Sequence, residues 1–422
     1  MTAATTASAM SPNLLLNEQV AALRSEGLDI LHLGFGEARL PLLPEMAEVL
    51  RGAVCHTGYP PVAGTPDARS AVAGWFERRG TPTRAEQVVL GPGTKPLLFA
   101  TMAGTPGEVY VGAPSWNSYA PQARLAGGCP SAVPVGIGGG APDPSLLRAR
   151  IETDVREGRL PRVVVVNSPD NPTGTHVQRD VLLEICRIAR DRDLLILSDE
   201  IYADLAHPGT GLHSAVHIAP ERTVAFTGLS KSLAVGGWRI GAARFPEEHP
   251  ALRQRVVSIA SDIWSSMPAP MQDVAAYAFD EPAPVRERLE CSRRLYAALG
   301  GRAHEICLGH GARVRRPTGA FYLYVDLEAH RGHLAAQGIT DARSLAHALL
   351  VRHHIAVLDG AALGDDPATL AFKIATTGFV GDDDEEQRGA LKANDAALVS
   401  HVAARLDRFD AALSDLLDGA GR

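Results

Sequence analysis

Three residues of this chain carry side chains suited to covalent chemistry, and apolar runs lead up to them. Lys231 offers an amine that can form a Schiff base with an aldehyde, and Arg239 offers a guanidinium that can bind a phosphate. Asp199 closely follows the apolar run 194–197 and offers a carboxylate that can keep a pyridine nitrogen protonated. An amine, a carboxylate and a guanidinium that meet at strand ends are what pyridoxal phosphate (PLP) requires from an enzyme.

Short apolar runs alternate with helical patterns over much of the chain, and they must position these residues. Several runs are almost purely Val, Leu and Ile, as expected of parallel strands covered by helices on both faces. The predicted strands are 87–90, 108–111, 131–135, 163–166, 194–197, 223–226 and 241–245. The predicted helices between them are 94–102, 116–125, 144–155 and 179–190. The predicted fold class is therefore α/β, with a mostly parallel central sheet flanked by helices.

The pattern changes after about Glu281, which predicts a second, smaller α+β domain. A helix at 285–299 precedes strands at 319–325 and 372–375, and one long helix at 383–417 closes the chain. We expect three parts, namely an N-terminal segment 1–48 that belongs to the small domain, a large PLP-binding domain 49–285, and a C-terminal small domain 286–422.

Composition argues against several classes of protein. The chain has 422 residues, a formal net charge of −7 and no basic stripe, which argues against nucleic-acid binding. Its five cysteines are scattered without CxxC spacing, as in a reducing compartment. Because it shows no leader pattern and no window of about 18 apolar residues, we expect a cytoplasmic protein without a membrane span. The pair His353–His354 lacks companion acids at metal-ligand spacing, so no metal site is predicted.

Three motifs connect the strand ends to a known family. They are Ser168-Pro169-Asp170-Asn171-Pro172-Thr173-Gly174, Asp199-Glu200-Ile201-Tyr202, and Ser230-Lys231 followed by Gly237-Trp238-Arg239-Ile240-Gly241. In this order they resemble the class I and II aminotransferases, the PLP-dependent transferases of fold type I, from about Leu31 to the C-terminus. The resemblance implies an enzyme of that fold that moves an amino group between an amino acid and a 2-oxo acid.

The resemblance also implies roles for residues around the PLP ring. Lys231 holds PLP as a Schiff base and then moves the α-proton of the substrate. Asp199 pairs with the ring nitrogen, while Tyr202 and Asn171 hydrogen bond to the phenolic oxygen. Trp116 matches the aromatic residue that stacks on the ring. The catalytic residues are expected to be Lys231, Asp199 and Tyr202.

A second group of residues matches the family's phosphate site. Gly93, Thr94 and Lys95 follow a strand and open a helix, so their backbone N–H groups can cradle a phosphate. The loop does not follow the P-loop pattern, because no glycine directly precedes the lysine. Ser230 and Arg239 are expected to complete the anion site.

The substrate contacts are expected from Gly36, Trp116, Asn171 and Lys373. Gly36 matches a backbone contact to the α-carboxylate of the substrate. Lys373 stands where most relatives have an arginine. Its ammonium is a point charge, whereas an arginine guanidinium can donate two parallel hydrogen bonds to a carboxylate. Three interpretations stay open: Lys373 binds the carboxylate with looser geometry, the acid sits differently, or the lysine merely decorates its strand.

Two further matches concern a neighbouring subunit. Tyr59 matches a tyrosine that in relatives reaches the phosphate of the other subunit, which implies a homodimer with shared active sites. The segment 261–268 resembles one that enters the neighbour's site, where dicarboxylate-specific relatives carry an arginine. Here Asp262, Ile263 and Trp264 occupy it without an arginine. The predicted amino donor therefore has a neutral or basic side chain.

Two alternatives to transamination are also open. Because Lys373 departs from the family pattern, the same cofactor could serve a lyase, cyclase or oxidase of a modified amino acid in specialised metabolism. A non-catalytic PLP-binding half of a transcription regulator is less favoured, since about thirty residues precede Leu31, too few for a helix-turn-helix domain.

Overall fold

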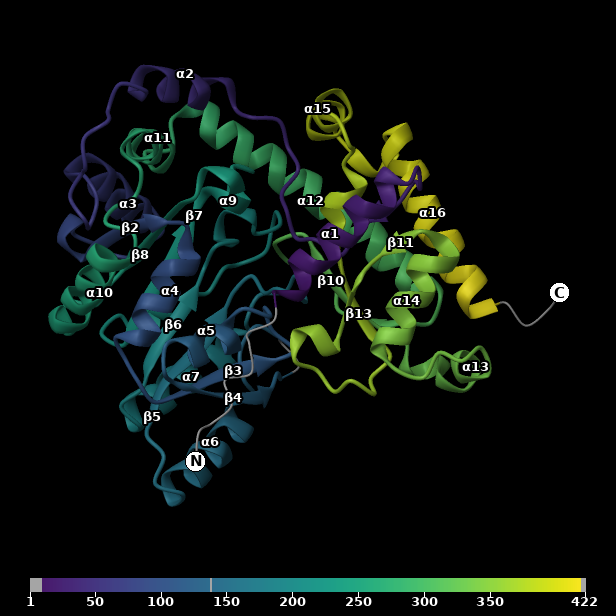
Figure 1. Cartoon of the computed structure of the whole chain (residues 1–422), viewed down its shortest axis with the longest axis horizontal. Coiled ribbons are helices and arrows are strands. Elements are labelled where there is room, and N and C mark those ends of the chain that lie inside the picture. The colour runs from purple at the N-terminus through teal and green to yellow at the C-terminus, as the bar shows by residue number, and fades with distance from the viewer. Residues whose placement is uncertain (1–9, 137–138, 419–422) are drawn as a thin grey trace.

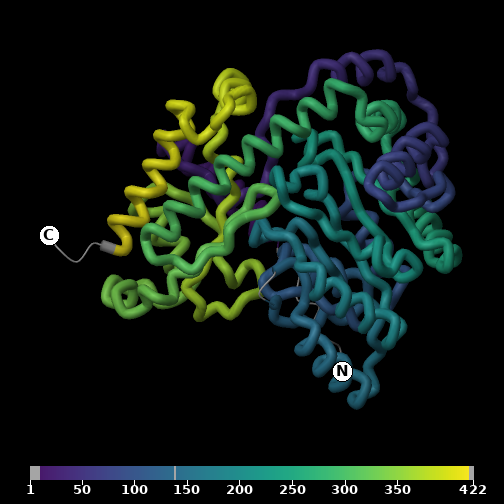
Figure 2. The backbone as a smooth tube through the Cα atoms, turned by 180° about the vertical axis from the view of Figure 1, so that it is seen from behind, coloured from purple at the N-terminus to yellow at the C-terminus, as the bar shows by residue number. Residues whose placement is uncertain are grey.

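The computed structural model describes residues 10–136 and 139–418. Figure 1 shows two regions side by side, one built on a large sheet and the other on a small sheet, with the long helix α12 (Ala283–Gly309) running between them. Figure 2 shows the same arrangement from behind, with the earliest described residues lying against the C-terminal region.

The large sheet has seven strands in the order β2-β8-β7-β6-β5-β3-β4. Within it only β8 runs antiparallel to its neighbours, and the other pairs of adjacent strands are parallel. The strands are β2 (Val88–Pro92), β3 (Glu108–Ala113), β4 (Cys129–Pro134), β5 (Pro161–Asn167), β6 (Leu195–Asp199), β7 (Thr223–Gly228) and β8 (Ile240–Arg244). All seven strands predicted from the apolar runs are present.

Helices cover both faces of this sheet, because alternate side chains of its strands point to opposite faces. On β5, Val163 and Val165 pack in one buried cluster, and Val164 and Val166 pack in another. Helices α4 (Thr94–Ala103), α5 (Tyr119–Leu125) and α10 (Pro250–Ile263) cover the first face, and α6 (Pro144–Arg156), α7 (Arg179–Asp191) and α8 (Ala215–Ile218) cover the second. A third buried cluster joins helices α2 (Pro44–Ala53), α3 (Pro66–Arg78) and α11 (Ala269–Phe279).

The small region is built on a four-stranded antiparallel sheet and a short parallel pair. The sheet has the order β12 (Leu358–Asp359), β13 (Ala371–Ala375), β10 (Tyr322–Asp326) and β9 (Arg313–Val314). The parallel pair joins β1 (Leu31–His32) to β11 (Ile355–Ala356). The helices here are α1 (Pro12–Ser25), α13 (Arg331–Ala336), α14 (Ala342–His353), α15 (Asp384–Lys392) and α16 (Ser400–Asp418).

Some predicted helix boundaries were wrong. The long helix predicted at 383–417 is two helices, α15 and α16, separated by a short turn. Ala393 has an extended backbone, and the Asp395 carboxylate accepts a hydrogen bond from the N–H of Ala397. Such a local side-chain bond competes with helical hydrogen bonding, so the helix stops and restarts. Helix α12 continues through residue 285, and the division of the chain at that point stays a prediction.

One edge of the large sheet gathers the residues that matter for chemistry. The parallel strands β5, β6 and β7 end there with Asn167, Asp199 and Gly228. Because β8 runs the other way, its beginning lies at the same edge and brings Arg239 there. Open α/β sheets bind ligands at this carboxyl edge.

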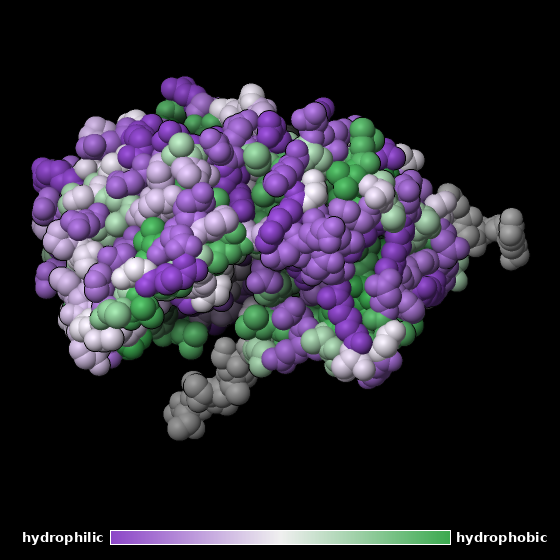
Figure 3. Space-filling view, turned by 90° about the horizontal axis from the view of Figure 1, so that it is seen from above, coloured by the Kyte–Doolittle hydropathy of each residue, from purple (hydrophilic) through white to green (hydrophobic). Residues whose placement is uncertain are grey.

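The outer surface is mixed in character. Hydrophilic residues cover most of the face in Figure 3, with small groups of hydrophobic residues between them. Among residues 10–136 and 139–418, no helix is both long enough and apolar enough to cross a bilayer.

Candidate active site

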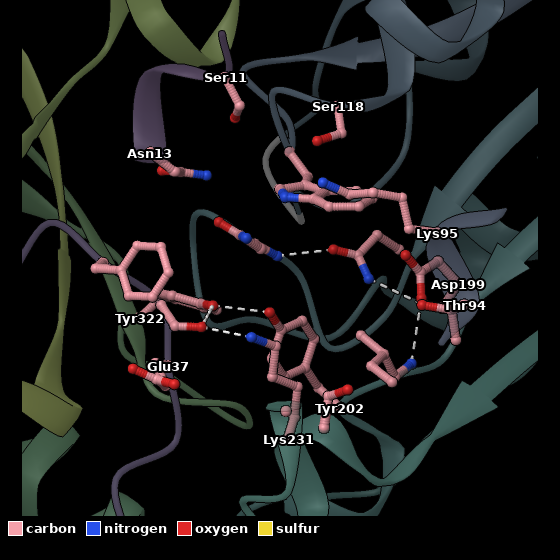
Figure 4. Close-up of a pocket in the computed structure, with 18 of the residues that line it drawn as sticks. Ser11, Asn13, Glu37, Thr94, Lys95, Ser118, Asp199, Tyr202, Lys231 and Tyr322 are labelled. Carbon is pink, nitrogen blue, oxygen red and sulfur yellow. Dashed lines mark hydrogen bonds between the residues drawn. The ribbon is translucent and has the colours of Figure 1, made fainter. Parts of the chain in front are cut away.

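A cavity of about 460 Å³ opens at this edge of the large sheet, between it and the small region. In Figure 4, Thr94, Lys95 and Ser118 lie on one wall, while Ser11 and Asn13 of the N-terminal segment and Tyr322 of the small sheet come from other sides. The predicted site residues that line it are Gly36, Thr94, Lys95, Trp116, Asn171, Asp199, Tyr202, Ser230, Lys231, Arg239 and Lys373.

Lys231 reaches the cavity from the short helix α9 (Leu229–Ser232), directly after β7. A Cβ on Gly228, between strand and helix, would lie 2.6 Å from the carbonyl oxygen of Ile240, so the close approach of β7 to β8 requires glycine. The Lys231 ammonium donates a hydrogen bond to the carbonyl oxygen of Gly36. Burial lowers the pKa of Lys231 to about 8, which brings its neutral, nucleophilic form within reach near neutral pH.

Asp199 ends β6 and is buried, at 3% exposure. Its Oδ2 accepts a hydrogen bond from the Tyr119 hydroxyl at 2.7 Å, and its Oδ1 accepts one from the N–H of Ile201 at 3.3 Å. Burial raises the pKa of Asp199 to about 6, while the bond from Tyr119 opposes the rise. Nothing in the sequence around Tyr119 predicts this role, because a tyrosine on a helix has no spacing signal for a contact to a distant strand.

Tyr202 and Asn171 lie together beside Lys231. The hydroxyl oxygens of Tyr202 and Tyr322 are 2.7 Å apart, and the Asn171 side chain also hydrogen bonds to Tyr202. The Asn171 backbone N–H donates to the Asn167 side chain at 2.8 Å, which holds this loop against the end of β5. Asn171 lines the cavity, and its Oδ1 is buried without a hydrogen-bond partner among the described residues.

An anion cradle lies at the N-terminus of α4. Gly93 precedes this helix with φ +89°, and a Cβ there would lie 2.2 Å from the Arg239 guanidinium. Only glycine therefore lets Arg239 and the free N–H groups of the helix start meet in one place. Ser230 and Thr94 also line this part of the cavity. A helix N-terminus beside a guanidinium is suited to bind a phosphate.

Trp116 and Lys95 form the adjacent wall. The Lys95 ammonium lies 5.1 Å from the centroid of the Trp116 ring, over its face. Burial and the nearby Arg239 lower the pKa of Lys95. No acidic side chain of the described residues forms an ion pair with Lys95, so a cation faces the cavity next to an aromatic plane.

Lys373 enters from β13 in the small sheet and is almost fully buried, at 1% exposure. Its ammonium lies 5.1 Å from the centroid of the Tyr322 ring, and no acidic side chain in the described parts of the chain pairs with it. Burial, with a smaller contribution from the charge of Lys231, lowers the pKa of Lys373 to about 7. The side chain therefore lines the binding cavity and does not decorate an exposed strand.

Two predicted residues do not line the cavity. Gly93 lies just beside it, and Tyr59 is 94% exposed on a loop elsewhere on this chain. Residues Ser11, Asn13 and Leu14, for which sequence gave no signal, do line it. Asn13 donates a hydrogen bond from Nδ2 to Oδ1 of Asn117 at 3.0 Å, which ties the N-terminal segment to the large region.

The residues fit PLP as a ligand. The glycine cradle with Arg239 suits its phosphate, and the buried Asp199 carboxylate, which forms no ion pair among the described residues, suits a protonated ring nitrogen. Lys231 supplies the amine that an aldehyde requires.

Comparison with known proteins agrees with this chemistry. Residues 29–377 match the family model described as "Aminotransferase class I and II". The chain belongs to this family, and it is therefore an enzyme of the PLP-dependent aminotransferase class.

The similarity to individual aminotransferases extends over most of the chain. The chain is 32% identical over 327 residues to the aspartate/prephenate aminotransferase of Thermus thermophilus, covering 75% of this chain and 82% of the relative. It is also 32% identical over 376 residues to the aspartate/prephenate aminotransferase of Cereibacter sphaeroides, covering 85% and 90%. The solved structure of Thermus thermophilus aspartate aminotransferase with maleate superimposes with a TM-score of 0.81 at 28% identity, covering 98% of this chain and all of that one.

Proposed function

We propose that this chain transfers the amino group of an amino acid to a 2-oxo acid, with Lys231 as the point of covalent attachment for PLP. The observation that carries this proposal is that Lys231, Asp199 and Arg239, which come from different strand ends, line one cavity. When bound, PLP supplies an electron sink that weakens the bonds at the α-carbon of the substrate. The protein must orient the substrate, protect the site and move protons.

Two sets of residues would hold the cofactor. The phosphate would bind at the start of α4, and the residues in contact would be Gly93, Thr94, Lys95, Ser230 and Arg239. The ring would lie against the face of Trp116, with Asp199 toward its nitrogen and Asn171 and Tyr202 toward its phenolic oxygen. At pH 7 Asp199 is mostly ionised, because its raised pKa of about 6 is still below that pH, and so it can pair with a cationic ring nitrogen.

Lys231 is positioned to carry the proton of the α-carbon. Lys231 lines the cavity, so its Nζ, when not covalently attached, would be a free amine there. With a pKa lowered to about 8 by burial, this amine can accept and return a proton near neutral pH. The Gly36 carbonyl accepts a hydrogen bond from Lys231 and so stabilises its ammonium form.

Lys373 is our candidate for the α-carboxylate of the substrate. An unpaired ammonium at 1% exposure costs free energy unless an anion joins it, and a substrate carboxylate supplies that anion. Because lysine binds as a point charge, the carboxylate is held less rigidly than by an arginine fork.

For the amino donor we propose a neutral or basic side chain, with an acidic one as the second candidate. The Glu37 carboxylate lines the cavity, and its charge favours the protonated form of Lys231, so a cationic side chain would find an attractive field there. Conversely, the unpaired Lys95 beside Trp116 would attract a distal carboxylate. The names of the relatives also include aspartate.

We also propose that the chain works as a homodimer. Tyr59 is too exposed to serve the cavity of its own chain, and Ile263, in the second segment expected to reach a neighbour, is 66% exposed. Light scattering should give twice the mass of one chain, and a monomer that retains full activity would contradict shared active sites.

The first experiment is an absorbance titration of the PLP-loaded protein with single amino acids, neutral and basic before acidic. Transamination predicts release of the 2-oxo acid and stoichiometric retention of the aminated cofactor in the absence of an acceptor. If ammonia is released or oxygen consumed while the aminated cofactor does not accumulate, the protein is instead a lyase or an oxidase. Repeating the titration with PLP-loaded Lys95→Gln separates the donor classes, because an acidic donor should lose more affinity than a neutral or basic one.

A further inference from the structure

Tyr322 occupies a position between the two binding regions of the cavity. Its hydroxyl oxygen lies 2.7 Å from that of Tyr202 and 3.5 Å from the carbonyl oxygen of Gly36. Its ring lies beneath the ammonium of Lys373 at 5.1 Å and meets the Tyr202 ring edge to face at 5.5 Å. A Cβ on Gly36 would lie 2.1 Å from the Tyr322 oxygen, so the glycine leaves room for this hydroxyl.

The two tyrosines have a fixed number of protons to share. Burial raises the pKa of both far above neutral, so each keeps its hydroxyl hydrogen. In one arrangement Tyr202 donates to Tyr322, and Tyr322 donates to the Gly36 carbonyl. In the other, Tyr322 donates to Tyr202, which frees the Tyr202 hydrogen to point into the cavity. The 2.7 Å separation accommodates either direction.

An anionic oxygen in the cavity selects the second arrangement, since only that arrangement gives it a donor from Tyr202. We propose that Tyr322 is a positioning residue: by donating to Tyr202 it turns the Tyr202 hydroxyl hydrogen toward the phenolic oxygen of bound PLP. This inference rests on the proposed function, because it needs PLP in the cavity. The contact with Lys373 involves only the Tyr322 ring, whereas this positioning role requires the Tyr322 hydroxyl.

Packing alone does not explain this hydroxyl, as a neighbouring residue shows. Tyr296 belongs to the same buried core as Tyr322, and its ring lies 5.1 Å from that of Phe321. The Tyr296 hydroxyl is buried without a hydrogen-bond partner among the described residues. Tyr296→Phe removes a buried hydroxyl from this core but leaves the hydrogen bond between Tyr322 and Tyr202, called the relay below, intact. It is therefore the matched control.

The test is a pH titration of the absorbance of bound PLP in the wild type and in Tyr322→Phe. A donor to the phenolic oxygen stabilises its anionic form and lowers the pH midpoint. The bond that Tyr322 donates polarises the Tyr202 hydroxyl and strengthens the bond that Tyr202 donates in turn. Tyr322→Phe should therefore raise the midpoint, with a roughly fivefold smaller acid dissociation constant, which is the scale of one hydrogen bond. Tyr296→Phe should leave the midpoint where it is. Tyr322→Leu, which also lacks a donor, should repeat the shift if the phenylalanine variant folds poorly.

A double-mutant cycle with Tyr202→Phe decides whether the effect passes through Tyr202. In a Tyr202→Phe background, removing the Tyr322 hydroxyl should cause no further shift. An unchanged midpoint in Tyr322→Phe, or a full shift that persists without the Tyr202 hydroxyl, would overturn the relay. If the wild type binds no PLP, the proposed function itself fails, an outcome distinct from a wild type that binds PLP with a midpoint insensitive to Tyr322.

Discussion

Each end of the cavity holds one buried charged side chain, Asp199 or Lys373, and the protein satisfies these two to different degrees. At the sheet end, the Asp199 carboxylate accepts hydrogen bonds from Tyr119 and from the backbone of Ile201 before any ligand arrives. At the other end, Lys373 is equally buried, yet no acidic side chain among the described residues pairs with it. Under the proposed function, the sheet end is preorganised for a cofactor that stays bound, whereas the small-sheet end leaves a charge for the substrate to satisfy.

The largest expected effect comes from removing the amine that serves both ends. Lys231→Ala should lower turnover by at least about 10³-fold, since both the covalent attachment and the proton carrier are lost. Single-turnover kinetics with a quench would measure this. Lys392→Ala, which removes an exposed lysine outside the cavity, serves as the control. Turnover by Lys231→Ala at a wild-type rate without added amine would disprove the assignment.

Next in size is the loss of the carboxylate at the sheet end. Asp199→Ala should retain some PLP through the phosphate cradle but slow α-proton removal by about 10²-fold or more, because the ring nitrogen loses its counter-charge. The rate of exchange of the α-proton with deuterated solvent reports this step directly. Asp199→Glu keeps the charge and should recover part of the rate, whereas equal rates in wild type and Asp199→Ala would refute the role.

At the small-sheet end we expect a pH-dependent binding effect. Because the pKa of Lys373 is lowered to about 7, its charge is lost as pH rises through 7, and the KM for the amino acid should rise over the same range. Lys373→Arg stays charged and should flatten this profile, while Lys373→Met should raise KM by about tenfold or more at pH 6. A KM unaffected by either substitution would show that the carboxylate binds elsewhere.

The same lysine should also lower the stability of the folded protein. Between pH 7 and its ordinary pKa of 10.5, the unfolded chain binds the Lys373 proton and the folded chain does not, so stability rises with pH there. Lys373→Met should therefore unfold at higher denaturant concentration than the wild type at pH 7, by about 1–3 kcal/mol, and the difference should shrink toward pH 10. Chemical denaturation of the cofactor-free protein at several pH values measures this.

The smallest expected effect sharpens the description of the sheet end. Tyr119→Phe removes the bond that holds the pKa of Asp199 down, so that pKa should rise above about 6. PLP binding then should weaken roughly fivefold near pH 6 and much less at pH 8. Equilibrium dialysis at both pH values would show this difference, and equal weakening at both would instead indicate a packing role for Tyr119.

The sheet end could be predicted from the sequence far better than the small-sheet end. Asp199 and Lys231 follow apolar runs, so the end of a strand and the side chain beyond it come from one local pattern. Tyr119 and Tyr322 act through contacts to residues far away in the chain, and no local spacing records such a contact. Whether Lys373 faced the cavity could not be decided from its strand pattern, because strand burial depends on the neighbouring sheet.

The pairing of β1 with β11 has a consequence for how the protein is made. Leu31 and His32 leave the ribosome long before their partners Ile355 and Ala356, which lie far downstream in the chain. The strands of the large sheet, between Val88 and Arg244, are complete long before that. The segment that carries Ser11 and Asn13 therefore has the apolar face of α1 uncovered until Leu350 and Ala356 have been made, and only then can the cavity gain this wall.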